Sequence, residues 1–423
     1  VSDLSFIPVN DSFYKIELKE CLPSQSPIGA PELPYMNVNI VIDKNEKIDS
    51  IKVINFEYQD IEGEYLIYPI QPPQVISEEP NGFTPPDSLI YSSSNFYPEK
   101  LSEYNSEGYM GGYRIANFFI YPLQYLPSQR KLRFYNFIQV KVYTSFSSYQ
   151  GLPVYRRSEK VQRLWEKIIK RIVYNPEDVH PLNILIKDFK ENKKFEITEF
   201  PSIYGNTVEC VVIIPDSSFL NCVKDFVDFK IKKGCPTAVK TLNWIYNNYE
   251  GLDKPDKIRN FLKDAYSYWG TMFACLIGDK ELIPVRGLWY NRGWYNGLTS
   301  SDAYYVGLNG NWNKDGDSIF GGRPERDSTP EIFVGRIVVN DTNEFKIFSE
   351  KYFSYIKPCS SYQNMALLFG STNKNGECTL VVRNIKNILT QSGYSVTNAV
   401  DYWPDQQNQE LKPIVISTMN MGA

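Results

Sequence analysis

Histidine is almost absent from this sequence, in which His180 is the only one among 423 residues. This scarcity confines any chemistry that needs an imidazole to one position of the chain. The seven cysteines form no CxxC pair and no short-spaced cluster, which argues against a structural zinc site. An odd, scattered set is also not typical of a disulfide framework, so we expect most of these thiols to be buried.

Long apolar runs and a strong charge of one sign are missing too. No apolar run reaches the roughly 18 residues that a membrane-spanning helix needs, and no signal peptide is visible. The formal net charge is only −4, so no nucleic-acid partner is expected. The chain opens on Val1 rather than on methionine, and we expect a leader to have been removed from it.

The length and a hydrophobic content of 42% are typical of a globular protein with several domains. The first half alternates apolar and polar residues in segments separated by turn-rich breaks, as half-buried antiparallel strands do. We therefore predict an all-β sandwich or barrel for residues 1–150. A connector with a basic helix is predicted for residues 151–205, since apolar residues recur there at helical spacing.

The remaining residues, 206–423, alternate short apolar strands with helices. The strands expected are VECVVIIP, TAVKTLNWI, MFACLIGD, EIFVGRIVV and, as the fifth, MALLFGS, and two helices end at Gly234 and Gly270. This order predicts an α/β domain with a mainly parallel sheet covered by helices. Sites in such sheets lie at the carboxyl ends of the strands, which is where Asp279 stands.

The order of these motifs resembles that of the gingipain-type cysteine peptidases, members of the caspase-like clan. The resemblance runs through ECVVIIP, IRNFLKDAYSYWG, CLIGDKELIPVR, SSDAYYVGL and PEIFVGRIVV, and GGYRIANFFIYPLQYLPSQRKL looks like the prodomain of that family. It implies a β-rich prodomain followed by a caspase-like peptidase domain. Residues 206–423 would be the first subdomain and the start of the second, incomplete at the C-terminal end.

The chemistry that the resemblance implies is a Cys/His dyad, in which a thiol attacks the scissile carbonyl and backbone N–H groups hold the oxyanion. In the family, the His-Gly pair comes shortly after a segment like KPIVISTMNMGA, and residues 181–423 contain no histidine. The resemblance therefore implies a dyad downstream of Ala423, no catalytic residue within this chain and no activity of this chain alone. His180 lies in the Pro-flanked connector, so we do not assign it as a base.

The resemblance also implies a setting. The protein would be a secreted or cell-surface endopeptidase with protein or peptide substrates, made as a zymogen whose prodomain packs on the peptidase domain. A different class of function stays open, namely a non-catalytic binding or scaffold protein built on a degenerate peptidase fold. A His-Gly pair and a later cysteine after Ala423 in the natural gene product would discriminate between the two. A flavodoxin-like nucleotide binder is disfavoured, because IIPDSSF lacks the glycines that let phosphate approach the backbone.

The stretch NGNWNKDGDSIFGG carries oxygen-bearing side chains at alternate positions, among them Asn311, Asn313, Asp315 and Asp317. Such side chains can curl round calcium, which takes about six to eight oxygen ligands. The EF-hand pattern fails at its last position, where Gly322 stands in place of the required glutamate. Two hypotheses stay open: a calcium loop, or a turn whose Asp side chains cap their own backbone.

A second calcium site is implied by the resemblance. Its carboxylates would be Asp279, Asp327 and Glu331, with the Thr329 carbonyl between the last two. Three carboxylates brought together would repel one another without a cation. The proposed role is structural, and the alternative is a solvated acidic rim.

Two further features concern the substrate and maturation. Arginine-specific members of the family need an acidic group at the base of the substrate pocket, and Glu377 is the only carboxylate in the comparable segment NKNGECTLVVRN. The Arg156–Arg157 pair and the Lys-rich segment 186–195 are candidate processing sites between prodomain and peptidase. A solvated basic face and linker is the alternative interpretation of both.

Overall fold

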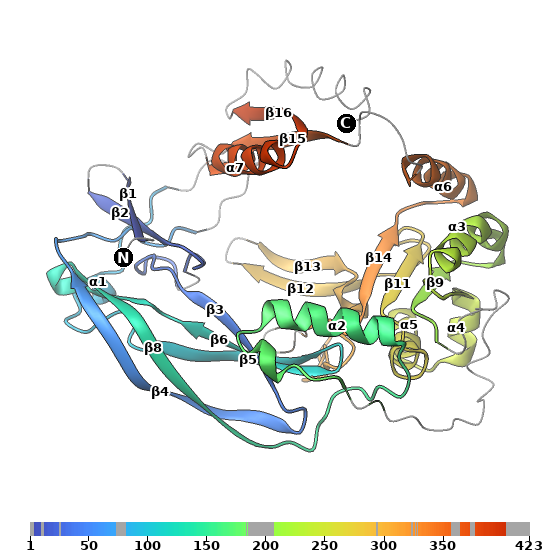
Figure 1. Cartoon of the computed structure of the whole chain (residues 1–423), viewed down its shortest axis with the longest axis horizontal. Helices are drawn as coiled ribbons and strands as arrows, with labels where there is room; N and C mark the ends of the chain where they lie inside the picture. Colours follow the sequence, from blue (N-terminus) through green and yellow to red (C-terminus); the bar gives the residue numbers. More distant parts are fainter. Residues whose placement is uncertain are drawn as a thin grey trace. The chain divides into compact units, whose positions relative to one another are not determined.

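The computed structural model of the chain divides into two compact units, residues 1–74 with 80–346, and residues 75–79 with 347–423. Figure 1 labels the helices and strands. The described residues are 4–9, 12–24, 27–72, 82–182, 184, 207–292, 295–322, 325, 327, 329–356, 364–372 and 377–402. Within these ranges, no helix is both long and apolar enough to span a membrane.

The N-terminal part of the first unit is β-rich, as the sequence predicts, and its described residues include the short helix α1 (Ser88–Tyr91). A β1–β2 hairpin accompanies two antiparallel sheets with the orders β3-β6-β5 and β4-β8-β7. The LPSQRK segment connects β7 to β8 as a turn, and Leu126 pairs with Lys131 across it. The strands are β1 (Leu4–Val9), β2 (Phe13–Leu18), β3 (Met36–Ile42), β4 (Glu46–Ile61), β5 (Ser102–Met110), β6 (Tyr113–Ile120), β7 (Leu123–Leu126) and β8 (Lys131–Phe146).

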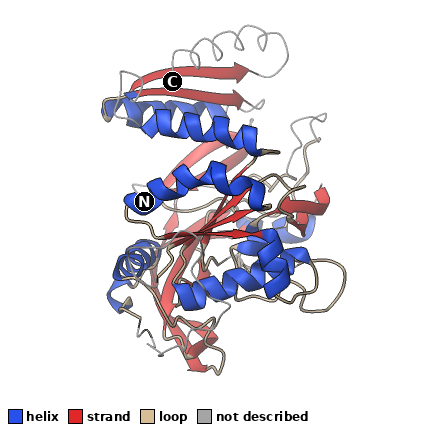
Figure 2. Cartoon of the chain, turned by 90° about the vertical axis from the view of Figure 1, so that its right-hand side faces the viewer, coloured by secondary structure: helices blue, strands red, loops and turns tan. Residues whose placement is uncertain are grey.

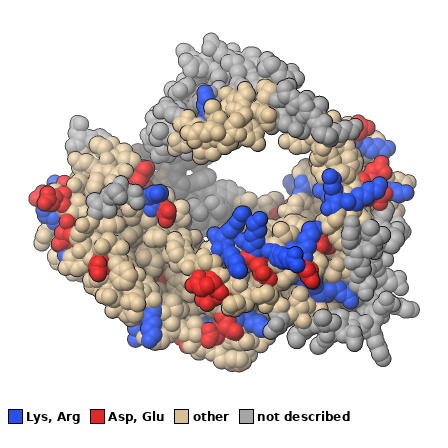
Figure 3. All heavy atoms as spheres, viewed as in Figure 1, with Lys and Arg blue, Asp and Glu red and all other residues tan. Residues whose placement is uncertain are grey.

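Helix α2 (Glu159–Ile172) follows this β-rich part and lies in the segment for which the sequence predicts a basic helix. Ser158 caps it, because the Ser158 hydroxyl accepts a hydrogen bond of 3.2 Å from the Val161 backbone N–H. Val161 and Trp165 are fully buried one turn apart, and Trp165 stacks on Phe333 with ring centroids 5.2 Å apart. The opposite face of α2 exposes basic side chains (Figure 3). These are Lys160, Arg163, Lys167, Lys170 and Arg171.

A four-stranded parallel sheet forms the second half of this unit and confirms the predicted α/β organisation. Its order is β10-β9-β11-β14, and helices flank its strands (Figure 2). The chain passes from β9 to β10 through α3 and returns to β11 through α4 and α5, and right-handed crossovers put these helices on opposite faces. The elements are β9 (Cys210–Ile214), α3 (Leu220–Lys232), β10 (Thr237–Thr241), α4 (Leu242–Asn248), α5 (Lys254–Asp264), β11 (Phe273–Ile277), a β12–β13 hairpin (Arg286–Arg292 and Tyr295–Ser301) and β14 (Phe333–Ile337). Helix α6 (Thr342–Ile356) follows, and the boundary between the two units falls within it, after Lys346.

One strand prediction extends too far. TAVKTLNWI is expected to be a single strand, but β10 ends at Thr241 and α4 begins at Leu242. The Thr241 hydroxyl accepts a hydrogen bond of 3.1 Å from the Trp244 backbone N–H. The threonine is therefore a helix cap, and this local contact ends the strand.

The second unit has a sheet of its own. MALLFGS forms β15 (Met365–Thr372), which pairs in parallel with β16 (Ser395–Tyr402) rather than adding a fifth strand to the sheet of the first unit. Helix α7 (Glu377–Gln391) connects these two strands. Glu377 begins that helix, and its side chain lies outside the described residues.

Candidate functional site

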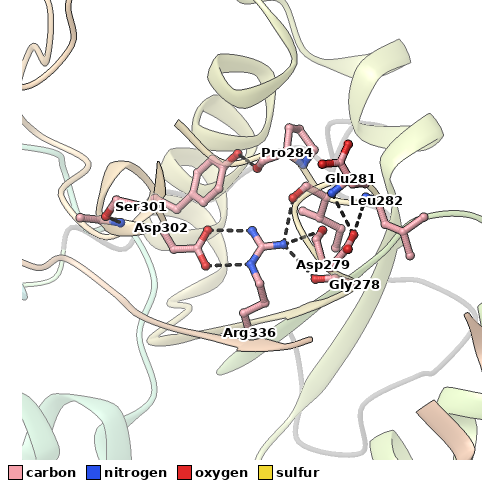
Figure 4. Close-up of polar contacts among 11 residues, drawn as sticks. Gly278, Asp279, Glu281, Leu282, Pro284, Ser301, Asp302 and Arg336 are labelled. Carbon is pink, nitrogen blue, oxygen red and sulfur yellow. Dashed lines mark hydrogen bonds and ion pairs between the residues drawn. The ribbon is translucent and has the colours of Figure 1, made fainter. Parts of the chain in front are cut away.

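Arg336 of β14 joins the loop after β11 to Asp302, which directly follows β13. The Nε and Nη2 atoms of Arg336 contact the two carboxylate oxygens of Asp302 at 2.8 and 2.7 Å (Figure 4). Its Nη1 donates to the main-chain oxygens of Gly278, Asp279 and Ile283 at 2.9, 3.1 and 2.9 Å. All three guanidinium nitrogens therefore have partners, and the Arg336 side chain is only 10% exposed.

The loop after β11 is fixed by further contacts. Oδ1 of Asp279 accepts hydrogen bonds from the backbone N–H groups of Glu281 and Leu282, at 2.8 and 3.1 Å. The Tyr305 hydroxyl donates to the main-chain oxygen of Pro284 at 2.5 Å. Ligands of α/β folds bind outside the carboxyl ends of the strands. These contacts therefore build a fixed rim at the edge of the sheet where a substrate is expected.

Asp302 and Arg336 are not among the site residues predicted from the sequence. Both stand in segments that carry the family resemblance, SSDAYYVGL and PEIFVGRIVV. One feature of the sequence points to this pair: Arg336 stands inside an apolar, β-branched strand. A buried guanidinium requires an anionic partner, so an acidic residue is expected nearby in the fold.

A second polar cluster lies at the opposite end of the sheet, just before β14 begins. The Glu331 side chain is fully buried. Its Oε2 accepts a hydrogen bond of 2.5 Å from the Leu308 backbone N–H, and its Oε1 accepts one from the Asn309 side-chain amide. Oδ2 of Asp327 accepts a hydrogen bond of 2.7 Å from the Gly310 backbone N–H. The carboxylates of Asp327 and Glu331 thus hold the turn at residues 308–310.

The same turn reaches the N-terminal β-rich part. Oδ1 of Asn309 accepts a hydrogen bond of 2.5 Å from the Leu152 backbone N–H, and the Tyr149 hydroxyl donates to the main-chain oxygen of Asn309 at 3.1 Å. From the α/β side, Arg259 donates to the main-chain oxygen of Gly307 at 2.8 Å. The cluster therefore joins the two parts of the first unit.

Burial dominates the electrostatics of this second cluster. It raises the pKa of Glu331 to about 8, with a further increase from the neighbouring Asp327 carboxylate. Burial also lowers the pKa of Arg259. Glu331 therefore retains its proton at neutral pH unless a cation compensates its charge.

The structure does not bring Asp279 to Asp327 and Glu331. Strands β11 and β14 are parallel, so a residue after β11 and a residue before β14 lie at opposite ends of the sheet. The Asp279 backbone N–H donates to the oxygen of Val339. Val339 is eight positions beyond Glu331, which corresponds to about 26 Å along an extended chain. The expected ligand set does not assemble, although the Thr329 backbone N–H donates to Oδ1 of Asp327 at 3.1 Å.

The Asn/Asp loop closes on its own backbone. Oδ1 of Asn311, Asp315 and Asp317 each accepts a hydrogen bond from the N–H two residues later, at 3.1, 3.1 and 2.6 Å. The Asn313 amide donates to the main-chain oxygen of Asp317 at 2.7 Å. These contacts match the hypothesis of a turn whose Asp side chains cap their own backbone. Within the described ranges, no three His, Cys, Asp or Glu side chains are grouped so that they could hold a metal ion.

His180 has no cysteine beside it in the described part of the chain. It borders a groove of about 580 Å³ whose described lining includes Tyr113, Val154 and Leu182, and none of the lining residues is a cysteine. Cys275 lies on β11, and burial raises the pKa of its thiol to about 11. These surroundings provide no activated nucleophile.

The Arg156–Arg157 pair is not an accessible processing site. The Arg157 side chain is buried, donates to the main-chain oxygen of Gly111 at 2.8 Å, and has its guanidinium carbon 5.5 Å from the centre of the Tyr266 ring. Proteolytic cleavage requires an exposed and adaptable segment, so the packing argues against this candidate. The other candidate, 186–195, lies outside the described residues.

Comparison with known proteins gives two family matches along the chain. The model for Peptidase family C25 matches residues 204–423, and the model Propeptide_C25 matches residues 4–180. Gingipain R1 of Porphyromonas gingivalis is 23% identical over 380 residues, which cover 87% of this chain and 33% of that protein. Gingipain R2 of the same species is 22% identical over 382 residues, which cover 87% of this chain and 45% of that protein. The chain thus spans less than half the length of these relatives.

Two solved structures show more limited likeness. The complex of Porphyromonas gingivalis RgpB pro- and mature domains has 21% identity and a TM-score of 0.33, covering 41% of this chain and 87% of that chain. The Arg-specific cysteine proteinase gingipain R has 24% identity and a TM-score of 0.34, covering 48% of this chain and 43% of that chain.

Proposed function

The chain belongs to peptidase family C25, and we propose that it is the proenzyme region of a secreted or cell-surface cysteine endopeptidase, made of the prodomain and the first part of the catalytic domain. The observation that carries this proposal is the succession of a propeptide match over residues 4–180 and a peptidase match over residues 204–423. Packing within the first unit supports it, because α2, the β-rich part and the parallel sheet share one apolar cluster.

The finer architecture belongs to the same proposal. The N-terminal sheets would form a sandwich-type prodomain, and the four-stranded sheet would be the first subdomain of a caspase-like fold. The second unit would begin the second subdomain. Its parallel β15–β16 pair with a connecting helix supports this interpretation.

The proposed reaction is hydrolysis of a peptide bond. A cysteine thiolate attacks the carbonyl carbon, a histidine passes a proton to the leaving amine, and water then hydrolyses the thioester. We assign neither residue within the chain, and we propose that residues 1–423 alone do not cleave peptides. The proposed role of this chain is structural. Arg336 and Asp302 hold the loop after β11 in place at the carboxyl end of the sheet. Glu377 is the proposed partner for a basic substrate side chain.

The test compares the full-length gene product with residues 1–423 on fluorogenic peptides ending in arginine, lysine or an uncharged residue. The full-length product should hydrolyse peptides after activation and lose this activity on treatment with iodoacetamide, whereas residues 1–423 should show none. Glu377→Gln should reduce cleavage after arginine relative to cleavage after the uncharged residue. A full-length product without any thiol-dependent hydrolysis would favour the scaffold function instead.

We also propose a structural calcium ion held by the carboxylates of Asp327 and Glu331, with Thr329 beside them. The support is electrostatic: the two carboxylates are neighbours, and burial together with Asp327 raises the pKa of Glu331 to about 8. A divalent cation would relieve this repulsion, and carboxylate oxygens are the ligands that calcium prefers. Asp279 and the Asn311–Asp317 loop are not part of this proposal.

Removing calcium should therefore lower the thermal midpoint of the wild-type chain. The measurement is thermal unfolding in EDTA and in millimolar calcium. The double variant Asp327→Asn/Glu331→Gln should unfold at the same temperature in both, and the control Asp315→Asn/Asp317→Asn should keep the wild-type difference. Identical midpoints for the wild-type chain with and without EDTA would contradict the proposal.

A further inference from the structure

Two free thiols, those of Cys210 and Cys235, lie side by side at the amino ends of β9 and β10. Cys210 begins β9 and is buried, whereas Cys235 stands in the turn before β10 and is half-buried. The two strands pair in parallel, with Cys210 opposite Thr237. The Cys210 and Cys235 side chains are hydrogen-bonded to each other. The backbone agrees with this contact, because the Cys210 N–H donates to the main-chain oxygen of Pro236, the residue after Cys235, at 3.0 Å. The two thiols are therefore close neighbours at the adjoining ends of two paired segments, as the partners of a disulfide must be.

The surroundings favour a thiolate on Cys235. The hydrogen bond from Cys210 and the nearby Lys160 ammonium lower the pKa of Cys235 to about 7, although burial and Glu209 oppose this shift. Lys160 is held in place, because its Nζ donates to Oε2 of Glu209 and to the main-chain oxygen of Gly234, both at 2.6 Å. A thiolate is the attacking species in thiol–disulfide exchange. Cys235 is thus the attacking partner of the pair, and the more buried Cys210 is the resolving partner.

We propose that Cys210 and Cys235 are a redox modification site that closes to an intramolecular disulfide by exchange with a small-molecule disulfide. The Cys235 thiolate attacks one sulfur of glutathione disulfide, forms a mixed disulfide and releases one glutathione thiolate. Cys210 then loses its proton to a released thiolate and attacks the Cys235 sulfur, which releases the second glutathione. The two protein thiols are oxidised, and one glutathione disulfide is reduced to two molecules of glutathione.

This site is independent of the proposed peptidase chemistry. Cys210 is the first residue of β9, so the pair lies at the amino ends of the strands, opposite the edge where a substrate is expected. The bond would tie the turn after α3 to β9, next to the contacts that Lys160 of α2 makes with Glu209 and Gly234. Its expected effect is a more stable first unit, because a cross-link restricts the unfolded chain.

The test exposes fully reduced residues 1–423 to glutathione disulfide under native conditions, then denatures the chain and counts its thiols. The count should fall by two from the seven cysteines of the sequence. Peptide mapping should find Cys210 joined to Cys235, and dithiothreitol should reverse the change. Cys222→Ser is the matched control, since Cys222 is also half-buried and donates to the main-chain oxygen of Phe219 at 3.0 Å. This variant should still form the cross-link.

Single variants separate the two roles. Cys210→Ser should retain a glutathione adduct on Cys235, because no resolving thiol remains, and Cys235→Ser should form neither adduct nor cross-link. Three results on the wild-type chain would overturn the proposal: an unchanged thiol count, a lasting adduct without a cross-link, or a cross-link between other cysteines. If either serine variant fails to fold, peptide mapping of the oxidised wild-type chain tests the proposal by itself, through the presence or absence of a Cys210–Cys235 cross-link.

Discussion

Glu331 is a carboxyl group whose ionisation the fold opposes. Its carboxyl group is fully buried and faces a second carboxylate, so its pKa rises from 4.5 to about 8 on folding. The folded chain therefore binds this proton more tightly than the unfolded chain does. By linkage, the contribution of Glu331 to stability is fully present below pH 4.5 and is lost as the pH rises towards 8.

Replacing this carboxyl group should remove that pH dependence. In EDTA, the free energy of unfolding of the wild-type chain should decline between about pH 4.5 and 8, and Glu331→Gln should flatten the decline. Urea unfolding at a series of pH values measures both. The control is Glu159→Gln, whose side chain is 86% exposed in the wild-type chain. Equal slopes for the wild-type chain and Glu331→Gln would refute this role.

The Arg336–Asp302 pair allows a second prediction. Asp302→Asn leaves a 10%-exposed guanidinium without its anion, and we expect a loss of about 2–4 kcal/mol in unfolding free energy. Asp60→Asn is a geometrically matched control, because Arg133 also contacts both Asp60 oxygens, at 2.7 and 3.1 Å. The Asp60 side chain is 64% exposed, so its loss should cost below about 1 kcal/mol. Similar losses for both variants, measured by urea unfolding, would count against the positioning role.

Some of these residues could be recognised from the sequence and others could not. Asp327 and Glu331 are four positions apart, and the family resemblance paired them before the structure was known. Asp302 and Arg336 are 34 positions apart, and only the strand order brings them together. The expected grouping of Asp279 with Glu331 could have been rejected beforehand, since one follows a strand and the other precedes its parallel neighbour.

Among the elements, α2 joins the β-rich part of the first unit to its parallel sheet. Trp165 is fully buried against Phe333 and shares a cluster with Tyr113 of β6. Trp165→Ala should therefore cost about 3–5 kcal/mol in unfolding free energy. Lys167→Ala on the exposed face should change it by no more than about 0.5 kcal/mol. A small effect of the tryptophan variant in urea unfolding would show that α2 is not the joint between the two parts.

Strands could be predicted from the sequence where burial on both faces requires a continuous run of apolar residues. β9, β11 and β14 are short apolar runs in a sheet with helices on both faces, and the sequence analysis finds all three. The boundary between β10 and α4 depends on one cap at Thr241, which an apolar pattern does not reveal. The pairing of β15 with β16 was likewise hidden, because β-branched runs show that a strand exists and not which strand it joins.

At the scale of the whole molecule, contacts from several elements hold the β-rich part against the α/β part. They include Trp165 on Phe333, Arg157 on Tyr266 and the hydrogen bond from Tyr149 to Asn309. A chain cut at an engineered protease site within 186–195 should therefore stay together and elute as one species in size-exclusion chromatography. Trp165→Ala in the cut chain should weaken the association. Separate elution of the two pieces without any variant would contradict this account of the prodomain.

The central claim is that this chain is the proenzyme region of a family C25 peptidase whose nucleophile is not among its own seven cysteines. The most direct measurement is to label the activated full-length protein with a peptidyl chloromethyl ketone and map the adduct by mass spectrometry. The account predicts a single labelled cysteine beyond residue 423, with label uptake matching the loss of hydrolysis. Labelling of one of the seven cysteines, together with loss of hydrolysis, would contradict it.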